Sequence, residues 1–138
     1  MNLSRRKFIL HIDDDEDDRT MLRESVKQID SSIELWVAHN GQEGLNILVQ
    51  CSLVDDLPGM IILDLNMPGM DGKKVLLDIM KHTVLSSIPV VIFTTSSSEL
   101  DKTFALKHGA KLYTKPSSGS EFFQVVKNIF EASYKANR

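Results

Sequence analysis

Short apolar runs recur five times along the chain, and segments with helical periodicity separate them. The runs occupy residues 8–12, about 33–38, 60–63, 90–93 and 111–114. Continuous apolar runs, rather than alternating ones, indicate strands that are buried on both faces, as in parallel sheets. The intervening segments repeat apolar residues at helical spacing, for example Val75, Leu76, Ile79 and Met80.

Five successive strand–helix units predict an α/β fold in which a doubly wound parallel sheet carries helices on both faces. We expect the flavodoxin-like (βα)5 arrangement with strand order 2-1-3-4-5, whose switch point lies between strands one and three. Ser96 and Glu99 have the spacing of a capping box, as do Ser118 and Glu121. Gly109 is expected to end the fourth helix.

Composition narrows the classes of function. The 138 residues fit one domain, and the 42% hydrophobic and 25% charged content is ordinary for a globular protein. The net charge of −3 provides no basic surface for nucleic acid, and no apolar run approaches the roughly 20 residues that span a bilayer. The single cysteine, Cys51, excludes an intrachain disulfide, so we expect a reducing, cytoplasmic location without membrane contact.

Polar residues follow the predicted strands at their carboxyl ends. The acidic run that starts with Asp13 and Asp14 follows the first strand, and Asp64 follows the third. Thr94 ends the fourth strand and Lys115 follows the fifth. Because ligands bind at this edge of open parallel sheets, these side chains are expected to share one site.

The residue types at this edge indicate phosphoryl chemistry that depends on a divalent metal. Neighbouring carboxylates repel one another unless a cation neutralises them, and oxygen ligands of this kind suit Mg²⁺. A carboxylate can then attack phosphorus as a nucleophile. Lys115 and the hydroxyl of Thr94 can stabilise the charge of the transferring group.

An ordered set of motifs resembles the receiver domain of the two-component response-regulator family. The motifs are residues 12–14 (IDD), 63–72 (LDLNMPGMDG), 92–95 (IFTT) and 115–116 (KP). The resemblance covers the chain from about Lys7 to Tyr134. We expect a receiver domain over residues 7–136, a flexible tail over residues 1–6, and no output domain.

The resemblance implies roles for the acidic residues. Asp64 would be the phosphoacceptor and a metal ligand. Asp14 would bind Mg²⁺ directly, Asp13 would hold it partly through water, and the backbone carbonyl of Asn66 would add a further ligand.

The resemblance also implies a phosphorylation switch. Thr94 would be the switch hydroxyl and Lys115 the phosphoryl-binding lysine, reaching the site through a cis Lys115–Pro116 peptide. Tyr113 is the candidate switch aromatic, although the family usually carries its aromatic three residues before the lysine, where this chain has Leu112.

The implied function is that of a stand-alone response regulator. It would accept a phosphoryl group from a sensor histidine kinase or a histidine phosphotransfer protein, and would catalyse only its own phosphorylation and dephosphorylation. Its signal to an unknown downstream effector, or to a second copy of the chain, would pass through the fourth helix, fifth strand and fifth helix.

Three alternatives share parts of this pattern. A flavin-binding flavodoxin has the same fold, but six consecutive acids after the first strand would repel the flavin phosphate. A haloacid-dehalogenase-like phosphatase needs a second aspartate two residues after its nucleophile, where this chain has Asn66. A receiver-like module that no longer takes phosphate would lack one of the required residues, and none is missing.

Overall fold

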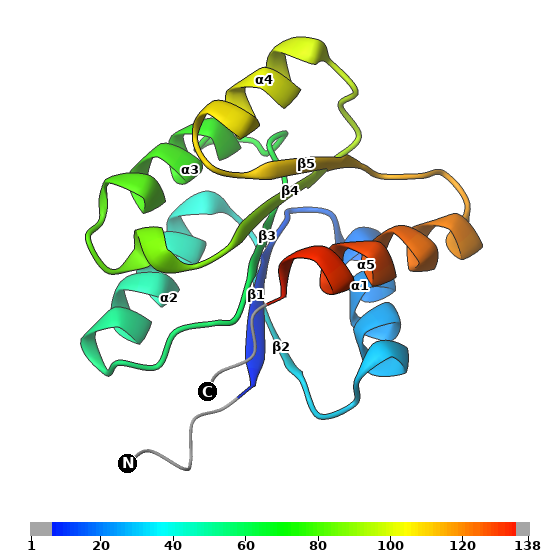
Figure 1. The fold of residues 1–138 in the computed structure, drawn as a ribbon, viewed down its shortest axis with the longest axis horizontal. Coiled ribbons are helices and arrows are strands. Elements are labelled where there is room, and N and C mark those ends of the chain that lie inside the picture. The colour runs from blue at the N-terminus through cyan, green and yellow to red at the C-terminus, as the bar shows by residue number, and fades with distance from the viewer. Residues whose placement is uncertain (1–6, 135–138) are drawn as a thin grey trace.

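The sheet contains five parallel strands in the order β2-β1-β3-β4-β5, as the sequence predicts (Figure 1). This computed structural model describes residues 7–134, so the expected tail over residues 1–6 and the last two residues of the expected domain lie outside the described residues. The strands are β1 (Phe8–Ile12), β2 (Glu34–Ala38), β3 (Ile61–Leu63), β4 (Val90–Thr94) and β5 (Lys111–Thr114). The helices are α1 (Glu16–Ile29), α2 (Gly41–Leu53), α3 (Gly72–Lys81), the short 3-10 helix η1 (Leu85–Ser87), α4 (Glu99–Lys107) and α5 (Gly119–Ser133).

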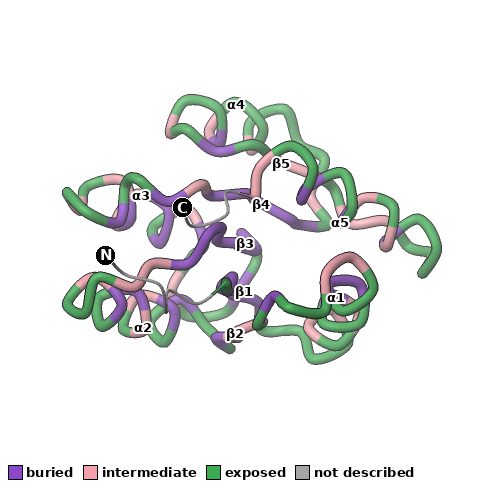
Figure 2. Tube along the Cα trace, turned by 60° about the horizontal axis from the view of Figure 1, so that its bottom comes forward, coloured by how far each residue is buried: buried purple, intermediate pink, exposed green. Residues whose placement is uncertain are grey.

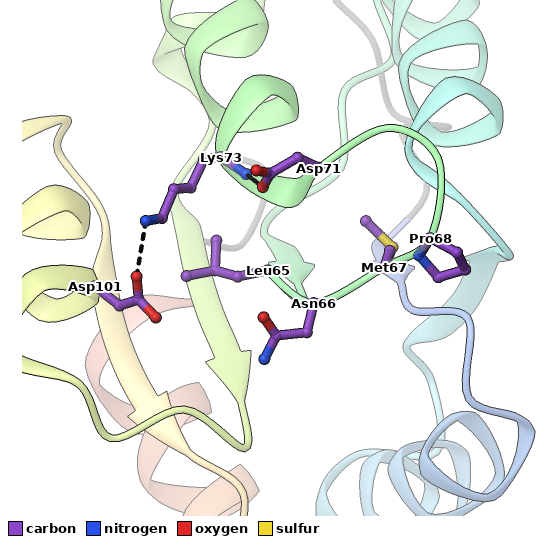
Figure 3. A pocket seen from close by; sticks show the side chains of 7 residues that line it. All are labelled: Leu65, Asn66, Met67, Pro68, Asp71, Lys73 and Asp101. Carbon is purple, nitrogen blue, oxygen red and sulfur yellow. Dashed lines mark hydrogen bonds and ion pairs between the residues drawn. The ribbon is translucent and has the colours of Figure 1, made fainter.

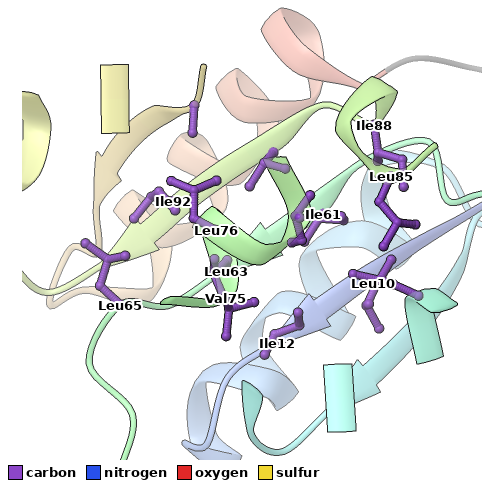
Figure 4. Close-up of a cluster of buried hydrophobic side chains, with 14 of the residues drawn as sticks. Leu10, Ile12, Ile61, Leu63, Leu65, Val75, Leu76, Leu85, Ile88 and Ile92 are labelled. Carbon is purple, nitrogen blue, oxygen red and sulfur yellow. The ribbon is translucent and has the colours of Figure 1, made fainter. Parts of the chain in front are cut away.

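Two hydrophobic clusters fill the two sides of the sheet, because successive side chains of a strand point to opposite faces. Leu10, Ile12 and Ile92 pack with residues of α2 and α3 on one side (Figure 4). Ile9 and Phe93 pack on the other side with residues of α1 and α5. The central strands are therefore buried throughout, whereas the helices are exposed on their outer faces (Figure 2).

The observed helix caps match those predicted from the sequence at some helix ends and differ at others. Ser118 caps α5 by accepting from the backbone N–H of Glu121, and Gly109 after α4 has a φ of +79°, which suits a glycine C-cap. The capping box predicted at Ser96 is wrong, because Ser98 caps α4. The hydroxyl of Ser96 instead donates to Asp101 at 2.6 Å, so the helix begins two residues later than a cap at Ser96 requires.

Candidate functional site

Three carboxylates meet where β1 and β3 end, as the predicted switch point requires. Asp13, Asp14 and Asp64 can each offer an oxygen such that all three oxygens lie within 4.8 Å of one another. Asp13 and Asp64 are buried and Asp14 is exposed, so the cluster opens to solvent on one side. An all-oxygen set of this size with an open side fits Mg²⁺, which keeps several waters in its shell.

Asp13 is the most constrained of these acids, since its side chain is fully buried. One carboxylate oxygen accepts from the backbone N–H of Asp15 at 2.9 Å. The other lies 2.7 Å from Nζ of Lys115 and 3.4 Å from Nε2 of His11. Burial raises the pKa of Asp13, but the contacts with His11 and Lys115 outweigh it and lower the pKa to about 2. Asp13 is therefore ionised and held in place.

His11 lies in β1, in the interior expected from its position in a strand. Its Nε2 faces Asp13, whereas its other ring nitrogen, Nδ1, has no hydrogen-bond partner among the described residues. His11 is thus a buried histidine with Nε2 facing the site.

The ammonium of Lys115 reaches the site from the end of β5. Its Nζ lies 2.7 Å from Asp13, 2.7 Å from Asp18 and 3.1 Å from Asp64, and its side chain is 4% exposed. Burial lowers the pKa of Lys115, but hydrogen bonds to Asp13 and Asp18 raise it well above the ordinary value, so the charge persists.

Two details at Lys115 differ from the sequence-based expectations. The cis Lys115–Pro116 peptide is wrong, because residues 7–134 contain no cis peptide bond. Trans is the favoured isomer, and the ammonium already reaches the carboxylates from it. Asp18 was not predicted as a site residue. The sequence feature that could have indicated it is its position in the first turn of α1, three residues after the N-cap Asp15.

Thr94 is fully buried at the end of β4 and lies beside the loop after β3. Its hydroxyl oxygen is 3.2 Å from Nδ2 of Asn66 and accepts from the backbone N–H of Ser96 at 3.3 Å. The backbone N–H of Asn66 donates to Asp64 at 3.1 Å. Asn66 thus connects Asp64 to Thr94, while its predicted role as a carbonyl ligand of the metal stays a prediction.

The carboxylate of Asp64 does not cap α3, because Asp71 is the N-cap of that helix. Asp64 borders an open cavity of about 480 Å³ that Asp14 and Lys115 also line. A second cavity of about 450 Å³ lies between the loop after β3 and α4 (Figure 3). Its lining comprises Leu65, Asn66, Met67, Pro68, Asp71, Lys73 and Asp101. The first cavity offers a small anionic group access to both Asp64 and Lys115.

Tyr113, the candidate switch aromatic, and its neighbour Leu112 lie on different sides of the sheet. Leu112 packs against the cluster that includes Ile92, whereas Tyr113 packs against the cluster beneath α5. Tyr113 is half-buried, and its role as the switch aromatic stays a prediction.

Comparisons with known proteins agree with this geometry. The family model described as the response regulator receiver domain matches residues 9–127. The chain is 32% identical over 126 residues to the response regulator Rcp1 of Synechocystis, covering 89% of this chain and 86% of Rcp1. It is 33% identical over 121 residues to the sensor histidine kinase CheAY of Helicobacter pylori, covering 87% of this chain but only 14% of CheAY.

Solved structures show the same fold. The phosphorylated cyanobacterial phytochrome response regulator RcpA superposes with a TM-score of 0.84 at 31% identity, covering 93% of this chain and 94% of that one. The Mn²⁺-bound form of Rcp1 gives a TM-score of 0.81 at 28% identity, covering 96% and 99%. These similarities support neither the flavodoxin nor the phosphatase alternative.

Proposed function

The chain belongs to the response-regulator receiver family, and we propose that Asp64 is its phosphoacceptor. It is a response regulator of two-component signalling, and its Asp13, Asp14 and Asp64 cluster suits a divalent metal. The observation that carries the proposal is the position of Asp64. Asp13 and Asp64 both belong to this cluster and contact the buried ammonium of Lys115. Of these two acids, Asp64 lines the open cavity, whereas the side chain of Asp13 is fully buried.

In the proposed reaction, a carboxylate oxygen of Asp64 attacks the phosphorus of a phosphohistidine. The new O–P bond forms as the P–N bond breaks, and the imidazole nitrogen leaves with the electron pair and takes a proton from water. Lys115 donates to the phosphoryl oxygens, and the hydroxyl of Thr94 turns from Asn66 toward the same group. Mg²⁺, held by Asp13, Asp14, Asp64 and the carbonyl of Asn66, would neutralise the charge of the phosphoryl oxygens.

The donor we propose is a sensor histidine kinase or a histidine phosphotransfer protein, and catalysis is limited to the protein's own phosphorylation and dephosphorylation. The part of the chain that the structure describes contains no helix long and apolar enough to cross a membrane. The lone cysteine, Cys51, is buried and suits a reducing compartment, so we place the protein in the cytoplasm.

The output surface we propose comprises α4, β5 and α5. Lys102 and Leu106 are exposed there, and they border a cavity of about 300 Å³ with Tyr113. This combination of apolar and basic groups suits a downstream effector or a second copy of the chain.

Phosphorylation of Asp64 can be tested with acetyl phosphate and with phosphorylated sensor kinases of the source organism. We expect a gain of one phosphoryl group by intact mass in the presence of Mg²⁺, and none with EDTA. Asp64→Asn should fold and stay unlabelled, whereas Asp78→Asn, at an acid of α3 outside the site, should be labelled like the wild type. Full labelling of Asp64→Asn would refute the assignment.

A further inference from the structure

Among the three acids that hold Lys115, Asp18 is the one that does not belong to the metal cluster. The ammonium has three donor hydrogens, and its partners are Asp13, Asp18 and Asp64 at 2.7, 2.7 and 3.1 Å. Asp13 and Asp64 also supply oxygens to the metal cluster, and Asp18 does not. A bound cation and the ammonium therefore compete for two carboxylates, and only the third remains with Lys115.

The backbone fixes Asp18 before any ligand arrives. Asp15 caps α1, and its carboxylate accepts from the backbone N–H of Asp18 at 3.1 Å. The guanidinium of the next residue, Arg19, donates to the backbone carbonyl of Asp13 at 2.9 Å, which joins the first turn to the end of β1. The carboxylate of Asp18 is 19% exposed, so solvent screens its contact with the ammonium only in part.

We propose that Asp18 is a positioning residue that keeps Lys115 at the rim of the site while Asp13 and Asp64 hold the cation. Without it, cation binding would draw away both charged partners of a nearly buried ammonium. A buried charge without partners raises the free energy of the metal-bound state, and this increase would weaken metal binding. Asp18 thus allows the cation and Lys115 to occupy one site together.

The rival explanation is that Asp18 merely adds negative charge to an acidic loop. Asp17 provides the matched control, because it belongs to the same acidic run and is exposed. Among the described residues, the ion pairs of Lys115 include Asp18 and not Asp17. A general charge effect would be similar for both residues, whereas positioning would act only through Lys115.

The test is a titration with Mn²⁺, followed by electron paramagnetic resonance, on Asp18→Asn, Asp17→Asn, Lys115→Met and the Asp18→Asn/Lys115→Met double variant. We expect about tenfold weaker Mn²⁺ binding for Asp18→Asn, the lower end for residues that support metal ligands. Asp17→Asn should change the affinity less than twofold. In the Lys115→Met background, Asp18→Asn should have no larger effect than Asp17→Asn, and Asp18→Glu should recover part of the affinity in the native background.

Wild-type affinity in Asp18→Asn would overturn the proposal, as would an equal loss with and without Lys115. Thermal unfolding of each variant identifies any that does not fold. The role in phosphoryl transfer rests on the function proposed for Asp64, but the titration uses no phosphodonor. Its failure is therefore distinguishable from a failure of Asp64 to be labelled.

Discussion

Nζ of Lys73 lies 2.9 Å from Oδ1 of Asp101 and joins α3 to α4 across the cleft in Figure 3. The other oxygen of Asp101 accepts from the hydroxyl of Ser96 at 2.6 Å, and the backbone N–H of Ser96 donates to Thr94. A continuous polar chain thus runs from the buried hydroxyl of Thr94 to the third helix. A displacement of Thr94 would therefore alter the contacts of Ser96 and then those of Asp101.

The Lys73–Asp101 pair is expected to stabilise the fold more than the Lys74–Asp78 pair, which lies within α3. Asp101 is half-buried and fixed by Ser96, so less side-chain entropy is lost when the pair forms. Double-mutant cycles with Lys→Met and Asp→Asn, measured by urea unfolding, should give the larger coupling free energy for Lys73–Asp101. Equal coupling in the two pairs would show that the bridge is an ordinary surface contact.

Acid should weaken this contact in a defined direction. The hydrogen bond from Ser96, and then the contact with Lys73, lower the pKa of Asp101 below the ordinary value of 3.8. A carboxyl group with a lowered pKa stabilises the folded state above its unfolded pKa, and this contribution is lost as the pH falls through the folded value. The difference in unfolding free energy between wild type and Asp101→Asn should therefore shrink below pH 3.8. In a Ser96→Ala background, Asp101→Asn should change the unfolding free energy less at neutral pH than it does in the wild type.

Gly72 begins α3 directly beneath the candidate phosphoacceptor. A Cβ there would lie 2.4 Å from the carbonyl oxygen of Asp64 and 2.5 Å from Cα of Leu65. Both atoms belong to the backbone, so Gly72→Ala should destabilise the protein by about 1–3 kcal/mol in denaturant unfolding. Gly119 begins α5 with no atom within 4 Å of the same position, so Gly119→Ala should be neutral or stabilising. Similar losses in both variants would point to helix initiation and not to packing under Asp64.

Much of this site follows from strand order, which the apolar runs already indicate. Asp13, Asp14 and Asp64 follow buried strands and Lys115 follows the edge strand β5, so a parallel sheet with the predicted order brings them together. Asp18 was missed because it belongs to a helix, where an acid in the first turn is common for reasons of the helix dipole alone.

Details that depend on competition between neighbouring groups were also not predictable. Ser96 and Ser98 are equally good caps by type, and the contact of Ser96 with Asp101 decides between them. Similarly, the isomer at Pro116 depends on whether a trans peptide lets Lys115 reach the acids.

Lys115→Ala should separate metal binding from the conformational response. Lys115 binds carboxylates and is not itself a metal ligand, so the variant should still bind Mn²⁺. It would lack the ammonium that contacts the new phosphoryl group. Phosphorylation should then cause little change in the amide signals of α4, β5 and α5. Identical spectral responses to phosphorylation in wild type and Lys115→Ala would exclude this role, with the labelled fraction checked by intact mass in both.

Phosphorylation should alter amide exchange on α4, β5 and α5 more than on α2 or the carboxyl end of α3. A phosphoryl group adds about −1.5 to −2 charge beside Thr94. The hydroxyl of Thr94 can reach it only by leaving Asn66 and Ser96, and the backbone carbonyl of Ser96 accepts from Thr114 of β5 at 3.2 Å. The displacement would therefore pass to β5 and α4 and shift the population of two arrangements. The residues expected to respond are Lys102, Phe104, Lys107, Tyr113 and Phe123.

Hydrogen exchange followed by mass spectrometry, with and without acetyl phosphate, measures this response. Asp64→Asn treated with the same donor is the control for direct effects of the reagent. Ser96→Ala would remove the hydroxyl that ties the loop to Asp101 while keeping the backbone contact with Thr94. It should therefore shift exchange in α4 without phosphorylation and leave Mn²⁺ binding unchanged. Changes confined to α2 and α3 in the wild type would mean that the signal leaves the site through the loop after β3, and that α4 and β5 are not the output surface.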